Sequence, residues 1–282
     1  MKKLFSILVS ENHHKTCSYR KNKRFTVAFL LLSAYGDSIT NATIMKFFKH
    51  ISKNLFTKIG GLCFISIALS SCLKDNNTYY NPPNALVTVI DAAPDQPSVD
   101  FYLDGNKVNQ VPVIYGGGIN YFKAYAGKRN AIFYSTGTTA KILADTVNLN
   151  SNYVYSLFLA NKPSNVELVM LTDSISQPTG NNANIRFVNL SPDAPAVDLG
   201  VKGSAAIITN KAYKGYSSFL PILGNTNYTF EVRQAGTNTV LATLPAQSLA
   251  SGSVYTIYFY GLATPTNTGD GLTVSIMNNA NY

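Results

Sequence analysis

The chain has 282 residues and a formal net charge of +9, which would normally indicate nucleic acid or an anionic membrane as a partner. The excess is confined to residues 1–71, with 11 basic and 2 acidic residues, so the remainder is neutral and we expect no nucleic-acid partner. All three histidines precede Cys72, the last cysteine, which excludes Ser-His-Asp, Cys-His and zinc chemistry after it; we expect no metal and no other cofactor.

Residues 1–44 form an upstream extension with a basic-then-apolar pattern, in which Lys21, Lys23 and Arg24 precede an apolar run at 25–32. Met45 is a second candidate start of the protein. We therefore expect residues 1–44 to be disordered or untranslated, and they do not enter the prediction of the fold.

Residues 45–71 have the layout of a secretory signal peptide. They begin with a Lys-rich segment, continue with an apolar segment at 59–69, and end in small residues before Cys72. The apolar segment is about half the roughly 20 residues that a transmembrane helix requires, which argues against a permanent membrane span.

The four residues that end this segment are Leu69, Ser70, Ser71 and Cys72, and they resemble the lipobox of bacterial lipoproteins. In that family the thiol receives a diacylglycerol, the signal is cut just before the cysteine, and the new amino group is usually acylated. Each buried methylene contributes about 0.8 kcal/mol, so two or more acyl chains hold a protein on a bilayer. The resemblance implies lipid attachment at Cys72, with the membrane as a partner.

Residues 72–84 are polar and rich in Asn and Pro, which suits an extended tether between a membrane and a folded domain. The order Cys-Leu-Lys-Asp-Asn is similar to the surface-export signals of Bacteroidetes lipoproteins, in which Lys and acidic residues follow the cysteine. It departs from the richer versions by having only Asp75. The resemblance implies an outer-membrane, lipid-anchored protein of the cell envelope that is exposed at the surface.

The remainder of the chain contains an internal repeat at a shift of 98 residues. The segment that starts at Val87, VTVIDAAPDQPSVDFYLDG, is similar to the segment that starts at Ile185, IRFVNLSPDAPAVDLGVKG. Each copy is a series of short runs with period-two patterning and β-branched or aromatic enrichment, separated by Gly, Asn or Pro, which is typical of strands. About 90 residues with some seven strands is the size of an immunoglobulin-like sandwich.

This pattern predicts an all-β fold with two tandem immunoglobulin-like β-sandwich domains. The first is expected at residues 85–172 and the second at 184–282, with a linker at 173–183. No stretch after Cys72 has convincing helical periodicity.

Both copies carry the motif P-D-x-P-x-V-D, which resembles the hallmark of an envelope domain family of unknown function with a SPDAPAVD-like segment after its first strand. Residues 191–198 match without interruption, and the first copy departs at Ala93, Gln96 and Ser98. The resemblance covers both halves and implies a secreted or surface β-sandwich, with no activity to transfer. We expect structural roles, because Pro-Asp-x-Pro fixes a turn whose Asp side chains hydrogen-bond nearby backbone N–H groups. The motif residues are Pro94, Asp95, Pro97, Asp100, Pro192, Asp193, Pro195 and Asp198.

Four carboxylates of the first copy could supply oxygen ligands to calcium. They are Asp91, Asp95, Asp100 and Asp104. Their spacing is not that of an EF-hand, and the second copy has Asn189 and Lys202 at the outer two places. A shared metal site should not replace a ligand with a cation, so we favour the structural interpretation.

The large number of tyrosines is the most informative feature of the composition, since 16 of the 18 tyrosines follow Cys72 and tryptophan is absent. In a strand at 254–260, alternation places Tyr258 and Tyr260 opposite the core face. The core-facing residues are Tyr255, Ile257 and Phe259. Exposed tyrosines can stack on sugar rings or anchor a protein interface, so Tyr258 and Tyr260 are candidate ligand contacts. The alternative, which we favour, is that they cover a sheet or pack against the neighbouring domain.

These features predict a lipid-anchored cell-envelope protein that acts as a non-catalytic binding or adhesion module for glycan or protein ligands. One alternative is a structural or assembly component of an envelope complex without a ligand of its own. A second is a hydrolase that uses carboxylates alone, which requires two carboxyl groups about 5 to 10 Å apart in one pocket. We expect no catalytic residues and no enzymatic activity.

Overall fold

The computed structural model describes residues 82–282, which fall within one compact unit. The predicted upstream extension, signal peptide and lipobox, Cys72, and residues 72–81 of the predicted tether lie outside the described residues. The described chain contains sixteen strands and one short 3-10 helix, η1 (Pro163–Asn165). Within this part of the chain, no helix has the length and apolar character needed to cross a membrane.

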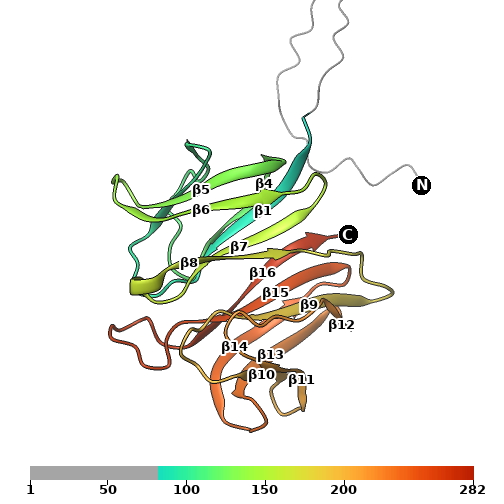
Figure 1. Cartoon of the computed structure of the whole chain (residues 1–282). Coiled ribbons are helices and arrows are strands. Elements are labelled where there is room, and N and C mark those ends of the chain that lie inside the picture. The colour runs from blue at the N-terminus through green and yellow to red at the C-terminus, as the bar shows by residue number, and fades with distance from the viewer. Residues whose placement is uncertain (1–81) are drawn as a thin grey trace, which may run out of the picture. The chain divides into compact units, whose positions relative to one another are not determined.

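The first domain consists of eight strands in two sheets (Figure 1). The strands are β1 (Asn84–Asp91), β2 (Val99–Leu103), β3 (Asn106–Lys107), β4 (Gly118–Tyr125), β5 (Gly127–Ser135), β6 (Lys141–Leu149), β7 (Val154–Ala160) and β8 (Glu167–Thr172). The inner sheet has the order β4-β1-β7-β8, and the outer sheet has the order β3-β2-β5-β6. β1 and β7 run parallel, whereas the other neighbours are antiparallel.

The second domain has the same arrangement of strands. The strands are β9 (Asn182–Asn189), β10 (Val197–Val201), β11 (Ala206–Lys211), β12 (Leu220–Leu223), β13 (Thr226–Gln234), β14 (Val240–Leu249), β15 (Ser253–Tyr260) and β16 (Thr273–Asn281). Its inner sheet is ordered β12-β9-β15-β16 and its outer sheet β11-β10-β13-β14. The prediction of an all-β fold with two tandem sandwiches is confirmed, with eight strands in each domain where about seven were expected.

The turn that carries the predicted motif takes the chain from the inner sheet to the outer sheet of each domain. Val99 begins β2 and Val197 begins β10, and both are fully buried, as the alternation predicts. Because β2 belongs to the opposite sheet, β1 lies between β4 and β7. This order differs from that of immunoglobulin constant domains, in which the first strand neighbours the second.

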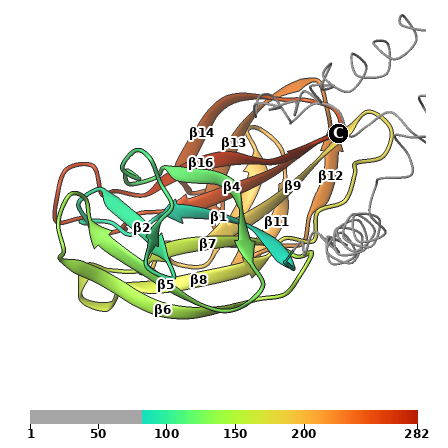
Figure 2. The ribbon, with the colours of Figure 1, turned by 90° about the horizontal axis from the view of Figure 1, so that it is seen from above.

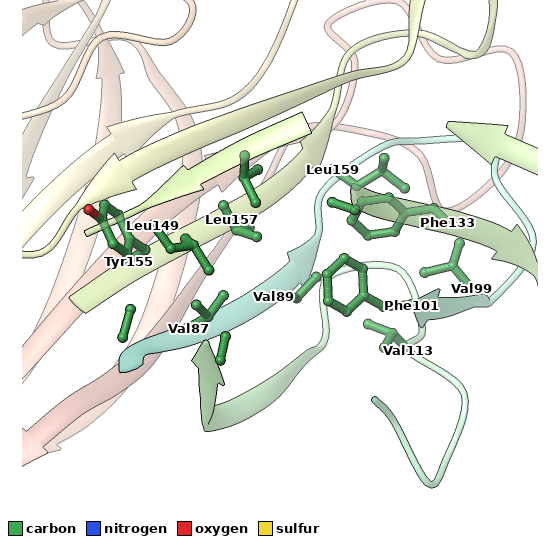
Figure 3. Packing of buried hydrophobic residues seen from close by; sticks show 14 of the residues in the cluster. Val87, Val89, Val99, Phe101, Val113, Phe133, Leu149, Tyr155, Leu157 and Leu159 are labelled. Atoms are coloured by element: carbon green, nitrogen blue, oxygen red, sulfur yellow. The ribbon is translucent and has the colours of Figure 1, made fainter. Parts of the chain in front are cut away.

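Period-two alternation directs one set of side chains from each strand into the core of its own domain. In the first domain, Phe101 and Phe133 face each other with ring centroids 4.9 Å apart, and Val87 and Val89 pack beside them (Figure 3). Burying one such side chain contributes about 1.5 to 3 kcal/mol. The second domain has a separate core, in which the fully buried aromatic residues are Phe187, Phe230 and Phe259.

The inner sheets are also buried on the face that points away from their own cores. β7 and β15 are almost continuously buried, which is typical of strands that are covered on both faces. Figure 2 shows β1 and β7 of the first domain from above. A third apolar cluster contains residues of both domains, and it forms the centre of what is called here the domain junction. Its members include Ile90, Phe158, Val169, Leu171, Val188, Leu190, Tyr258 and Tyr260.

Candidate functional site

Tyr258 and Tyr260 lie inside the domain junction and are only 4% and 6% exposed. The Tyr258 hydroxyl donates a hydrogen bond of 2.8 Å to the Gly116 carbonyl, and the Tyr260 ring lies edge-on to Tyr115 at 5.1 Å. The face assigned to them by alternation is correct, and because this face is buried, the interpretation of both tyrosines as exposed ligand contacts is wrong. β15 is a central strand of a sheet that the first domain covers, so the favoured alternative, packing against the neighbouring domain, describes both side chains.

A buried ion pair lies in the polar centre of the junction. Arg186 of β9 places Nη2 2.6 Å from Oδ1 of Asp173, the residue that follows β8, and both side chains are fully buried. Asp173 Oδ2 accepts hydrogen bonds from the Tyr121 hydroxyl (2.6 Å) and from Ser156 Oγ (2.8 Å). Arg186 Nε donates to Thr256 Oγ1 at 2.9 Å. The ion pair offsets two buried charges that would otherwise destabilise the junction, and the hydrogen bonds satisfy Asp173 Oδ2 and Arg186 Nε.

The second aspartate of each motif binds the turn between the fifth and sixth strands of its domain. Asp100 Oδ2 accepts a hydrogen bond from Gly137 N (3.2 Å), and Asp198 Oδ2 accepts one from Gly236 N (2.9 Å). Although burial acts to raise the pKa of Asp100, hydrogen bonds from Lys107 and its other partners hold that pKa below its ordinary value. The donors are distant in sequence, whereas the motif predicts nearby ones.

The first aspartate of each motif contacts the segment between β15 and β16. Asp193 Oδ1 accepts a hydrogen bond from Ala263 N (2.8 Å) within the second domain. Asp95 N donates to Asp270 Oδ1 (3.2 Å), and the Thr266 hydroxyl donates to Asp95 Oδ2 (3.0 Å), so these contacts connect the two domains. Among the motif prolines, Pro94 is buried and Pro192 is half-buried, whereas Pro97 and Pro195 are exposed.

The four carboxylates considered for calcium have different neighbours. Asp91 accepts a hydrogen bond from Ala93 N, whereas Asp104 forms an ion pair with Arg129 at 3.1 Å. Across residues 82–282, no three acidic, Cys or His side chains are grouped so that they could hold a metal ion.

A pair of tyrosines, Tyr102 of β2 and Tyr134 of β5, lies on the outer sheet of the first domain, on the face opposite the core. Their ring centroids are 5.2 Å apart and their planes meet at 81°, so the rings are nearly perpendicular. Both side chains are half-buried. Alternation explains their position, because Phe101 and Phe133 immediately before them point into the core.

An open, shallow hollow of about 340 Å³ lies on the same sheet, beside this pair. It is lined by Asn130, Ile132, Ala144, Asp145 and Thr146. The strand register connects it to the tyrosines, because Tyr102 pairs with Ile132, which pairs with Ala144. Aromatic, aliphatic and polar side chains therefore form one surface across β2, β5 and β6, called here the tyrosine face.

The second domain has no such surface at the same register positions. Gly200 and Arg233 stand in place of the two tyrosines, and Glu231 stands in place of the isoleucine. Arg233 is 7% exposed and is bound to Glu231 Oε2 (2.7 Å), Ser204 O (2.8 Å) and Val201 O (3.1 Å). These bonds hold the guanidinium against the backbone beside Gly200.

The sequence prediction missed Tyr102 and Tyr134 as candidate contacts. A signal was present, because in DFYL and NAIFY a phenylalanine directly precedes each tyrosine. Once the phenylalanines are assigned to the core, alternation directs the tyrosines outward.

Residues 85–200 match the family model of a domain of unknown function, DUF4397. No curated protein matches the chain.

Several solved structures are distantly similar. They include a family 26 carbohydrate-binding module of Eubacterium rectale Amy13K in complex with maltoheptaose (10% identity, 70% of this chain, 97% of that chain, TM-score 0.24). The Bacillus anthracis TIE protein is 9% identical over 70% of this chain and 44% of its own, with a TM-score of 0.22. An α-glucan-binding streptococcal virulence factor is 10% identical over 63% of this chain and 92% of its own, with a TM-score of 0.21. TM-scores of this size do not indicate a shared fold.

Proposed function

We propose that this protein is a lipid-anchored, surface-exposed protein of the cell envelope that binds glycans without catalysing a reaction. The tyrosine face of the first domain is the binding surface, and Cys72 carries the lipid. The perpendicular Tyr102 and Tyr134 rings on an open sheet are the observation on which the binding function rests.

The chemistry of the tyrosine face suits a sugar. The apolar C–H face of a sugar ring packs against an aromatic ring, and tyrosine offers this surface at a low entropy cost because it has only two χ angles. The adjacent hollow adds the amide of Asn130 and the hydroxyl of Thr146, which can hydrogen-bond sugar hydroxyls. A surface with an aromatic anchor and a few polar groups is the usual composition of a ligand site.

The carboxylates of this surface favour binding over hydrolysis. A glycosidase uses two carboxyl groups about 5 to 10 Å apart on either side of the bond it cuts. Asp145 is the one carboxylate among the residues that line the hollow. The closely spaced Asp95 and Asp270 are instead bound to each other's loops at the domain junction.

The lipid anchor and the surface location rest on the sequence before residue 82. A tether of about a dozen residues would keep the first domain near the membrane and leave its outer sheet accessible to extracellular glycans. An envelope location also brings the protein into contact with polysaccharides of its surroundings.

A glycan array with the full-length chain in detergent tests the binding function. We expect reproducible binding of at least one glycan class, and a loss of at least about tenfold in affinity when Tyr102 and Tyr134 are both replaced by alanine, which corresponds to about 1.4 kcal/mol. Tyr125→Ala is the matched control, since Tyr125 is an exposed tyrosine of the inner sheet. An array without hits, together with a stably co-purifying envelope protein, would instead favour the assembly role.

A further inference from the structure

The far side of the hollow is too distant from the tyrosines for one sugar ring to contact both. Neighbouring strands are about 4.8 Å apart, so Tyr102 on β2 and Ala144 on β6, with Ile132 of β5 between them, are separated by roughly 10 Å. A ring that stacks on the tyrosines therefore leaves the far side of the hollow, at Ala144 and Thr146, free for a second unit.

The tyrosine pair itself provides one stacking position. Because the Tyr102 and Tyr134 rings meet at 81°, a sugar ring that lies parallel to one of them meets the other edge-on. The two rings thus form a corner for a single sugar unit. A flat row of aromatic rings, by contrast, would stack several units in succession.

The hollow has hydrogen-bonding groups that are not used by the protein. Asn130 N donates to Asp104 Oδ1, and Thr146 N donates to Asp145 Oδ1. Within residues 82–282, the side-chain amide of Asn130 and the hydroxyl of Thr146 form no hydrogen bond to another residue. Both groups are exposed and can therefore bind the hydroxyls of a second sugar unit.

The charges around the face favour a neutral ligand. Asp145 is an exposed carboxylate at the hollow, whereas Lys128, two residues before Asn130, and Lys141, which pairs with Tyr134, are exposed cations of the same sheet. Charges of opposite sign therefore surround the face, and they do not select an anionic or a cationic sugar. Lys107, which pairs with Tyr102 across β2 and β3, is bound to Asp100 at 2.8 Å, so its charge is already compensated.

From this geometry we infer that the tyrosine face binds a neutral oligosaccharide of at least two sugar units, with one unit stacked at Tyr102 and Tyr134 and the next in the hollow at Asn130 and Thr146. This inference rests on the proposed glycan-binding function. The two described domains together carry one such site, because Gly200 and Arg233 occupy the corresponding places of the second domain.

Isothermal titration calorimetry of the full-length chain tests this inference. The probes are the malto-, cello- and manno-oligosaccharide series from monosaccharide to tetrasaccharide, together with an oligogalacturonate as the anionic probe. We expect one of the neutral series to bind with a stoichiometry near one, with its tetrasaccharide at least about tenfold tighter than its monosaccharide.

Two variants separate the two positions. We expect Asn130→Ala to weaken tetrasaccharide binding about fivefold and to leave monosaccharide binding unchanged, whereas Tyr134→Ala weakens both. Thr229→Ala is the control, because Thr229 O accepts a hydrogen bond from Lys202 N in the second domain as Asn130 O does from Asp104 N in the first.

Equal affinity for monosaccharide and tetrasaccharide, an equal effect of Asn130→Ala on both, or binding of the anionic probe alone would overturn the two-unit neutral site and leave glycan binding standing. Absence of binding to every probe and to the glycan array would overturn the glycan-binding function as well.

Discussion

Nη2 of Arg186 lies 2.6 Å from Oδ1 of Asp173, and this ion pair joins the second domain to the residue that follows the last strand of the first. Nη2 also donates a hydrogen bond of 3.1 Å to Ser156 Oγ on β7, so the guanidinium contacts a central strand of the other domain. Ser156 and Thr256, which the guanidinium contacts, lie two residues before Phe158 and Tyr258 of the apolar cluster. The two sandwiches are therefore expected to unfold together, because separating them would expose two charges and an apolar sheet face.

Removing one charge of the buried pair should destabilise the protein strongly. We expect Asp173→Ala to lower the free energy of unfolding by about 3 to 5 kcal/mol, because Arg186 would be left buried without its partner. Urea unfolding followed by circular dichroism measures this change. The control is Lys214→Ala, which removes an exposed ion pair with Glu167 and should cost less than about 1 kcal/mol. Equal effects of the two variants would show that the junction is open in solution.

Tyr258 should stabilise the junction mainly through its ring. We expect Tyr258→Ala to cost about 3 to 5 kcal/mol, because it leaves a cavity in the apolar cluster. Tyr258→Phe removes only the hydrogen bond to Gly116 O and should cost about 1 kcal/mol. Tyr153→Ala, at an exposed position, is the control and should change the stability by less than about 0.5 kcal/mol. A Tyr258→Ala protein as stable as this control would contradict the packing described above.

Asp91 and its counterpart in the second domain, Asn189, differ in the hydrogen bonding of their second polar side-chain atom. Asp91 Oδ1 accepts a hydrogen bond from Ala93 N as Asn189 Oδ1 does from Ser191 N, but Asn189 Nδ2 also donates to Lys211 O (2.9 Å). Asp91 Oδ2 has no hydrogen-bond partner among the described residues. Burial raises the pKa of Asp91 from 3.8 to about 7, and the bond from Ala93 N opposes this only in part.

Asp91→Asn should therefore stabilise the protein at neutral and higher pH. A carboxyl with a raised pKa holds its proton more tightly in the folded state, so its ionisation lowers the free energy of unfolding as the pH rises from 3.8 to about 7. A pKa that is higher by one in the folded than in the unfolded state corresponds to about 1.4 kcal/mol. We expect wild type to lose up to a few kcal/mol over this interval and Asp91→Asn to lose less. Thermal unfolding at pH 5 and pH 8 measures the difference; parallel pH profiles for the two proteins would rule out a raised pKa for Asp91.

Cys72→Ser tests the lipid anchor. We expect the variant to leave the membrane fraction and accumulate in soluble or uncleaved form, because a serine hydroxyl cannot receive the diacylglycerol through a thioether. Cell fractionation and mass spectrometry of the mature protein measure both effects. Cys63→Ser is the matched control, since Cys63 belongs to the segment that the predicted cleavage would remove. If Cys72→Ser fractionates and migrates like the parent, residues 45–71 are not a lipoprotein signal.

Alternation along each strand is a local property, and it made much of the fold predictable. The positions of Val99 and Val197 at the start of buried strands, and of Ile257 and Phe259 on a core face, follow from a period of two. The repeat likewise predicted two sandwiches in tandem. The lipid attachment at Cys72 also derives from sequence and stays a prediction.

What covers a face depends on contacts between distant segments, and only the tertiary structure decided it. Alternation placed Tyr258 and Tyr260 away from their own core, but it could not show that the first domain covers them. The pairing of Arg186 with Asp173 likewise requires two sheets to meet face to face. Tyr102 and Tyr134 became a candidate site because folding leaves their side of the outer sheet accessible, since a strand pattern specifies the direction of a side chain and not its neighbours.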